Sequence, residues 1–122
     1  MFCFLFLFDI EKIEILVERK GNKMCMAEYE VEEETLRIKL PEELDHSNTA
    51  YIREEADKCI YSGSVRNVEF DFSKTKFMDS SGIGMIMGRY RLVNPIGGKI
   101  ILSGVQGNIE RIIKISGLYK LV

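Results

Sequence analysis

The fold of this chain is decided by residues 68–90, which read VEFDFSKTKFMDSSGIGMIMGRY. The first five residues alternate apolar and acidic side chains, the period of a β-strand with one buried face. From Ser80 onward the apolar residues recur at helical spacing, namely Ile83, Ile86, Met87, Tyr90 and Val93. The stretch therefore predicts a strand, a loop and an amphipathic helix whose N-cap is Asp79 or Ser80.

Elements of the same kinds precede this stretch. Residues 27–31 and 35–40 predict two strands joined by a tight turn, and Pro41 ends the second strand because proline has no N–H to donate. Ser47 to Thr49 are the expected N-cap region of a helix that ends at Gly63. The apolar face of that helix is expected to consist of Ile52, Ala56, Cys59 and Ile60.

Three further elements follow the central helix. Residues 100–102 are continuously apolar and predict a strand buried on both faces. A third helix is expected around residues 109–113, closing at Gly117, with a last short strand over 118–122. The order β-β-α-β-α-β-α-β predicts an α/β fold with a mixed, mainly parallel sheet.

Length and composition exclude several classes of protein. The 122 residues fit one domain, and a net charge of −2 argues against a nucleic-acid binder. No apolar run approaches the ~20 residues that span a membrane. His46 is the one histidine, and the three cysteines (Cys3, Cys25, Cys59) lack C-x-x-C spacing. We therefore expect no metal site and no disulfide framework, and a reducing, cytoplasmic location.

Residues 1–23 differ in character from the rest of the sequence. An apolar run over residues 2–8 precedes a polar run over residues 18–23, without the basic start or cleavage site of a signal peptide. The segment is interpreted as an extra element covering a sheet edge, as a membrane-surface anchor, or as a leader that is not part of the native protein. Its zero net charge disfavours the anchor. We therefore expect the domain itself to occupy residues 24–122.

Residues 24–45 are strongly acidic, with eight acidic side chains against two basic ones. One interpretation is a solvated hairpin. The other is an acidic rim that steers a basic partner toward the domain.

The candidate functional residues cluster at the start of the central helix. Asp, Ser and Gly are common at any helix N-terminus, where unpaired N–H groups favour an oxygen acceptor. Four small residues crowd the first turn, which is expected to be exposed and open to a partner or a nucleotide: Ser80, Ser81, Gly82 and Gly84.

Three functions are compatible with the residue types in this turn. A dinucleotide site is disfavoured because the glycine spacing is off by one and no acidic residue follows at about twenty positions. A serine hydrolase is disfavoured because G-x-S-x-G is absent and His46 has no reason to reach Ser80. The third function is a serine that is itself the substrate of a kinase.

Residues 77–84 and 88–90 resemble the phosphorylation-site signature of the anti-sigma factor antagonists of the STAS domain family, most closely the sporulation type. Residues 40–46, with Thr49 and Ala50, resemble the family's G-E-L-D-H loop, although Pro41 stands where the family has glycine. Residues 116–118 resemble the S-G-L that closes the family's third helix. The resemblance covers residues 24–122, whereas the family has a further helix beyond the position of Val122.

The resemblance implies a four- to five-stranded sheet with helices mostly on one side. It implies that Ser80 is the phosphorylated serine and that its partner-binding neighbours are Asp45, Asp79, Ser81, Gly82 and Gly84. The implied partners are an anti-sigma factor with serine kinase activity and a separate serine phosphatase. The chain would supply no catalytic group, cofactor or metal. The alternative is a STAS-like module that binds a nucleotide or small ligand and lacks the phosphoswitch.

Overall fold

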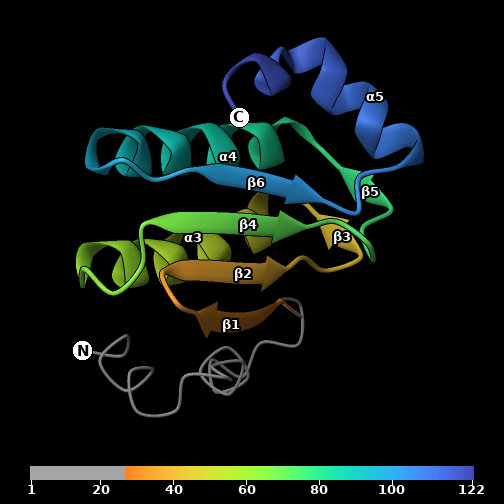
Figure 1. Ribbon diagram of the computed structural model, residues 1–122. Coiled ribbons are helices and arrows are strands. Elements are labelled where there is room, and N and C mark those ends of the chain that lie inside the picture. Colours follow the sequence, from red (N-terminus) through yellow and green to blue (C-terminus); the bar gives the residue numbers. More distant parts are fainter. Residues whose placement is uncertain (1–26) are drawn as a thin grey trace.

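The computed structural model of this chain describes residues 27–122 (Figure 1). Residues 1–26 lie outside the described part, and with them the predicted segment 1–23 and its apolar run. The described residues form a four-stranded sheet, a two-stranded sheet, three α-helices and two short 3-10 turns.

The main sheet confirms the predicted mixed, mainly parallel topology. Its strands lie in the order β1-β2-β4-β6, with β1 antiparallel to β2 and the other neighbours parallel. The strands are β1 (Glu28–Glu32), β2 (Thr35–Lys39), β4 (Asn67–Asp71) and β6 (Ile100–Ser103). The turn from β1 to β2 places Glu33 in the left-handed region, with φ of 59°.

Two of the helices cover one face of this sheet. They are α3 (His46–Tyr61) and α4 (Ser80–Val93), which pack against each other behind the strands in Figure 1. The third helix, α5 (Gly107–Ser116), lies beside the end of the sheet near β5 (Phe77–Met78). The opposite face of the sheet carries no helix among the described residues, which confirms the expected one-sided packing.

The core lies between the sheet and these two helices. The alternating strand residues Ile38 and Phe70 are fully buried, as are Ile52 of α3 and Ile86 of α4. Burying each such side chain stabilises the fold by roughly 1.5–3 kcal/mol. The apolar residues that recur along the strands and helices therefore explain why the sheet and the helices pack together.

A second, two-stranded sheet was not expected from the sequence. The strands β3 (Glu43–Leu44) and β5 pair in parallel, and each runs directly into a helix, β3 into α3 and β5 into α4. A strand of two residues is too short to show the alternation of apolar and polar side chains, so the sequence pattern does not predict β3 or β5. This small sheet brings together two loops that are far apart along the chain.

Three sequence-based predictions about the elements are wrong. The N-cap of α3 is Asp45 instead of Ser47 to Thr49, because the Asp45 carboxylate accepts the backbone N–H of Asn48 in the first turn of the helix. Ile101 of β6 is 40% exposed, because the face of the sheet opposite the helices is open. Residues 118–120 form a 3-10 turn, η2 (Leu118–Lys120), where a strand was expected. The other turn, η1 (Asn94–Ile96), follows α4 directly.

Candidate functional site

The helices α3 and α4 begin side by side at one end of the sheet. Leu44 pairs with Met78 in the β3–β5 ladder, and the backbone N–H of Asp79 donates to the Leu44 carbonyl at 3.3 Å. Asp45 and Asp79 therefore occupy equivalent positions, each as the N-cap of the following helix. Their backbone angles are nearly the same, with φ of −108° and −102° and ψ of −175° for both.

Asp45 is held in place by the first turn of α3. Its carboxylate accepts the backbone N–H of Asn48 at 3.0 Å. The Asn48 side chain is buried, and its Nδ2 donates to the Glu43 carbonyl at 2.6 Å. The loop that carries Asp45 is thus fixed to both β3 and α3, which gives the carboxylate a defined position beside the second loop.

Asp79 caps α4 in the same way and is further held by Ser81. The carboxylate accepts the Ser81 backbone N–H at 2.9 Å and also the Ser81 hydroxyl. The hydroxyl is the main cause that lowers the pKa of Asp79 below its usual value, and the Ser81 N–H and nearby His46 lower it further. Asp79 is therefore a negative charge at the start of α4, where the helix dipole favours it.

Ser80 is the first residue of α4 and is exposed. Among the described residues its hydroxyl has no hydrogen-bond partner, whereas the Ser81 hydroxyl is occupied by Asp79. Gly84, one turn further along, is also exposed, and a Cβ there would meet no atom within 4 Å. The turn thus presents one free hydroxyl on a surface of small residues, as the sequence predicted.

Gly82 differs from its small neighbours because it is buried. A Cβ at Gly82 would lie 2.6 Å from the Met78 side chain and 3.2 Å from Leu44. The expectation that Gly82 lies on the exposed part of the turn is therefore wrong. Its lack of a side chain lets the start of α4 pack closely on β3 and β5, so that it positions Ser80 from beneath.

An ion pair between the two helices was missed by the sequence reasoning. Arg89 Nε of α4 lies 3.0 Å from Asp57 Oδ1 of α3, without hydrogen-bond geometry, and Arg89 Nη1 donates to the Met85 carbonyl at 3.2 Å. Burial raises the pKa of Asp57 and lowers that of Arg89. The sequence does indicate a buried arginine, because Arg89 falls on the same helical face as the apolar residues Met85 and Val93.

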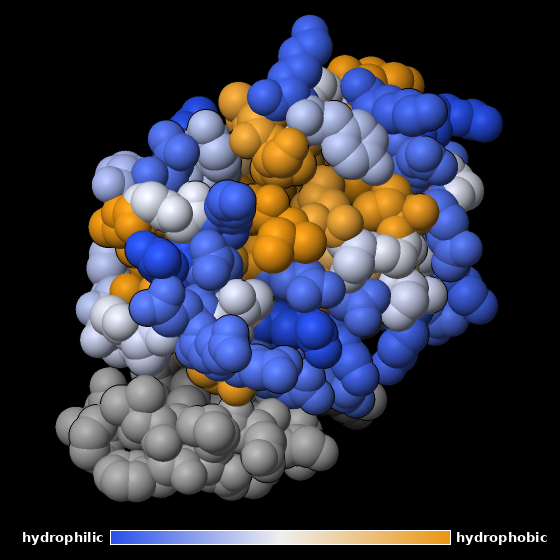
Figure 2. All heavy atoms as spheres, viewed as in Figure 1, coloured by the Kyte–Doolittle hydropathy of each residue, from blue (hydrophilic) through white to orange (hydrophobic). Residues whose placement is uncertain are grey.

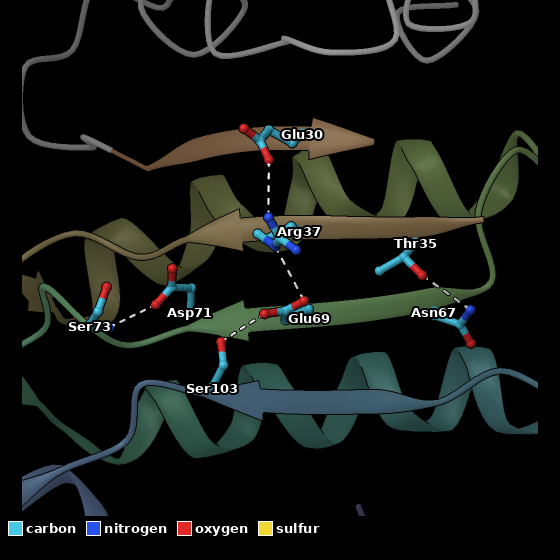
Figure 3. Close-up of polar contacts among 8 residues, drawn as sticks. All are labelled: Glu30, Thr35, Arg37, Asn67, Glu69, Asp71, Ser73 and Ser103. Carbon is cyan, nitrogen blue, oxygen red and sulfur yellow. Dashed lines mark hydrogen bonds and ion pairs between the residues drawn. The ribbon is translucent and has the colours of Figure 1, made fainter. Parts of the chain in front are cut away.

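The open face of the sheet carries a row of polar side chains (Figure 3). Arg37 lies between two glutamates, with Nη1 at 3.4 Å from Glu30 Oε1 and Nε at 3.3 Å from Glu69 Oε1, and Ser103 donates to Glu69 at 2.8 Å. A cavity of about 200 Å³ lies beside this row. Figure 2 shows a mainly hydrophilic face with an apolar area toward β6, where Ile101 is exposed. Ser80 does not line this cavity.

Residues 27–122 contain neither a metal-binding cluster nor a membrane-spanning helix. No cluster of three or more histidine, cysteine or acidic side chains within this range is arranged to hold a metal ion. None of the helices in the same range has the length and apolar character needed to cross a membrane.

Comparison with known proteins gives concordant matches. The family model for the STAS domain matches residues 26–122. The anti-sigma F factor antagonist of Paenibacillus polymyxa is 34% identical over 87 residues, which cover 71% of this chain and 74% of that protein. An identity of 34% over 74% of that protein indicates a common family and not only a common fold.

Two solved structures of one relative also match. The anti-sigma factor antagonist SpoIIAA in its unphosphorylated form aligns with a TM-score of 0.73 at 33% identity, covering 78% of this chain and 84% of that one. The phosphorylated form of the Bacillus cell fate determinant SpoIIAA aligns with a TM-score of 0.67, also at 33% identity, covering 78% and 86%. Sheet topology, helix placement and sequence agree, and the chain therefore belongs to the STAS domain family, among its anti-sigma factor antagonists.

Proposed function

We propose that this chain is a sporulation-type antagonist that acts in the cytoplasm through a phosphoswitch on Ser80. In its unmodified form it binds an anti-sigma factor and thereby frees a sigma factor for transcription. The observation that carries the proposal is the exposed Ser80 hydroxyl at the start of α4, which has no partner among the described residues. The similarity to a relative known in phosphorylated and unphosphorylated forms supports it.

The binding surface comprises the two neighbouring helix starts. Asp45, Asp79, Ser80, Ser81 and Gly84 lie on or beside the exposed turns, while Gly82 supports them from below. Small side chains let a partner approach the backbone closely, and the two fixed carboxylates favour a partner with basic groups at this place.

The modification reaction uses the partner's chemistry. The anti-sigma factor, acting as a serine kinase, transfers the γ-phosphoryl group of ATP to Ser80 Oγ. The O–H bond of the serine breaks, its proton passes to a base on the kinase, and ADP leaves. The chain itself supplies the hydroxyl and holds it in place, because Asp79 and Ser81 fix the first turn of α4.

Phosphorylation then prevents binding. The phosphate adds a charge of about −1.5 to −2 and three acceptor oxygens. That charge lies beside the ionised Asp79 and close to Asp45, in an interface without room for it. A desolvated charge without a partner costs several kcal/mol, equivalent to a loss of affinity on the order of 10²–10³-fold. A separate serine phosphatase returns the chain to its binding form.

The experiment that tests this function combines the chain with its cognate anti-sigma factor and ATP. Mass mapping is expected to place one phosphate on Ser80, and the phosphorylated chain is expected to dissociate from the partner. Ser80→Ala is the matched variant: it keeps the turn small, binds the partner and stays bound when ATP is added. Ser80→Asp is expected to bind at least tenfold more weakly than the parent.

Two outcomes would overturn the phosphoswitch. One is equal binding of the parent, Ser80→Ala and Ser80→Asp chains. The other is a specific rise in melting temperature with ATP or GTP alone, without the partner, which would favour the nucleotide-binding module in its place.

A further inference from the structure

The strand register brings the start of α3, with His46, beside the start of α4, with Ser80. The β3–β5 ladder pairs Leu44 with Met78, and the hydrogen bond from Asp79 N–H to the Leu44 carbonyl extends the pairing by one step. Continuing this register places Asp45 opposite Asp79 and His46 opposite Ser80. Neighbouring strands lie about 4.8 Å apart, so the two helices that continue from these strands begin close together, although 34 positions separate His46 from Ser80 in the sequence.

The two residues also have matching local environments. His46 is the first residue of α3 and Ser80 is the first residue of α4, and each follows an aspartate in extended conformation. Both side chains are exposed, so that they share one solvent-facing surface. The charge and the backbone N–H of His46 contribute to the lowered pKa of Asp79, which confirms that the start of α3 reaches the start of α4.

The charged groups on β3 and at the two helix caps are carboxylates, and α5, which packs near β5, carries Glu110, Arg111 and Lys114. Asp45 and Asp79 are the two N-caps, and Glu43 is exposed at the beginning of β3. The nearest lysine before β5 is Lys76, whose Nζ lies 3.5 Å from a carboxylate oxygen of Glu42. A phosphate on Ser80 would meet negative charge from both caps, and His46 is the side chain placed to offset it.

We propose that His46 is the phosphate-contacting residue of this chain, whose protonated imidazole pairs with the phosphoryl group once Ser80 is modified. The proposal rests on the proposed function, because it takes Ser80 as the phosphorylated residue and names the side chain that contacts the phosphate. Histidine gains its charge in the physiological pH range, and the second ionisation of phosphoserine also occurs near pH 6. The pair therefore makes the phosphorylated form keep its dianionic phosphate to a lower pH than it would without the imidazole.

The coupling between the two groups is reciprocal, which makes it measurable from either side. If the phosphate raises the titration midpoint of the imidazole, the imidazole lowers the midpoint of the phosphate by the same amount. Both groups are solvent-exposed, so a shift of about 0.5 pH unit, or about threefold in the ionisation constant, is expected.

The experiment uses the full chain with phosphoserine installed at position 80 during translation, so that it requires neither kinase nor anti-sigma factor. The phosphorus NMR signal of the single phosphate is titrated between pH 4.5 and 8 in the parent and in His46→Gln, at about 0.1 M salt. Because His46 is the one histidine in the sequence, its imidazole proton signal is titrated in the same samples without further assignment. The phosphate midpoint is expected to be about 0.5 unit lower in the parent than in His46→Gln.

Lys99→Gln is the matched control, because it removes one positive charge next to β6 at the opposite end of the sheet. It is expected to leave both midpoints unchanged. The proposal is overturned if His46→Gln leaves the phosphate midpoint in place, or if Lys99→Gln moves it as far as His46→Gln does. Since no partner is present, a failure of the phosphoswitch itself would appear only in the binding experiment described above.

Discussion

Ser80 and Ser81 are chemically alike, but their surroundings give them different roles. The Ser81 hydroxyl and N–H both bind the Asp79 carboxylate, whereas Ser80 faces solvent. A kinase requires a hydroxyl that can reach its active site and lose its proton, and Ser80 meets that requirement. The family resemblance favours Ser80 over Ser81, and the surroundings of the two hydroxyl groups supply a physical reason for that choice.

Ser81→Ala tests this difference. The lowered pKa of Asp79 stabilises the fold above the pKa that the carboxyl has in the unfolded chain, and this contribution is lost as pH falls through the lower, folded value. Removing the Ser81 hydroxyl weakens that effect, so the variant is expected to lose about 1 kcal/mol or less at pH 7 and to lose stability less steeply between about pH 5 and pH 3. Urea unfolding at several pH values measures both quantities.

The same variant is expected to remain a kinase substrate with its phosphate on Ser80. If mass mapping found the modification abolished in Ser81→Ala, the phosphorylated residue would have to be Ser81. The phosphorylation and stability measurements are independent, because one reports on the hydroxyl of Ser80 and the other on the carboxylate of Asp79.

Gly82→Ala is expected to destabilise the fold. The added Cβ would lie 2.6 Å from the Met78 side chain, closer than any ordinary contact. Overpacking of this kind typically costs about 1–3 kcal/mol, less any relief from movement of the flexible methionine. Urea unfolding is the measurement, and a shifted helix start should also slow phosphorylation of Ser80.

Gly84→Ala provides the control for that prediction. A Cβ at Gly84 meets no atom within 4 Å, and alanine favours a helix interior over glycine by about 1 kcal/mol. This variant is expected to be as stable as the parent or more so. Equal destabilisation of the two variants would show that the close contact with Met78 does not explain the effect.

At the scale of elements, the register of α3 against α4 determines whether the two loops meet. The helices touch along their length, and the Arg89–Asp57 ion pair joins them at a buried point. Buried ion pairs contribute little net stability compared with apolar pairs, but removing one partner leaves the other charge unpaired. The pair therefore acts mainly to define one helix alignment.

A double-mutant cycle tests this role. Asp57→Asn is expected to cost about 2 kcal/mol, below the value for a fully buried pair because Asp57 is 27% exposed. Replacing both residues, as Asp57→Asn with Arg89→Met, is expected to restore most of that loss. Urea unfolding measures the cycle, and additive losses in the double variant would contradict the expected coupling.

The pH dependence of stability gives a second check on Asp57. Burial raises its pKa, so ionisation of this carboxyl opposes folding as pH rises from the unfolded value through the raised one. Asp57→Asn is expected to remove this opposing contribution of Asp57. The free energy of unfolding of the variant should therefore rise more steeply with pH in this acidic range than that of the parent.

At the scale of the whole molecule, phosphorylation is expected to leave the fold intact. Ser80 is exposed at a helix N-terminus, where an added anion is favourable, and no core residue has to move. The melting temperature of the phosphorylated chain should lie within about 3 °C of the parent, equivalent to less than about 1 kcal/mol. Amide chemical shifts should change at the starts of α3 and α4 and not in β1 or β6.

Sequence reasoning predicted the layers of this fold more reliably than its junctions. The alternation in β2 and β4 and the helical face of α3 identified their elements, because periodic burial leaves a periodic sequence. The start of α3 was misplaced because the run from Asp45 to Thr49 contains several residues that can cap a helix. The two-residue strands β3 and β5 and the pairing of their loops depend on contacts between distant residues, which no local pattern contains.

The geometry of the molecule has a practical consequence for immobilising it. Val122 lines a cavity with Asn94 and Lys99, at the far end of α4 from Ser80. Fourteen helical residues separate the two ends of α4, a span of about 20 Å. An affinity tag joined after Val122 would therefore tether the protein to a resin or sensor chip near the end of α4 and leave the turn that carries Ser80 free for binding measurements.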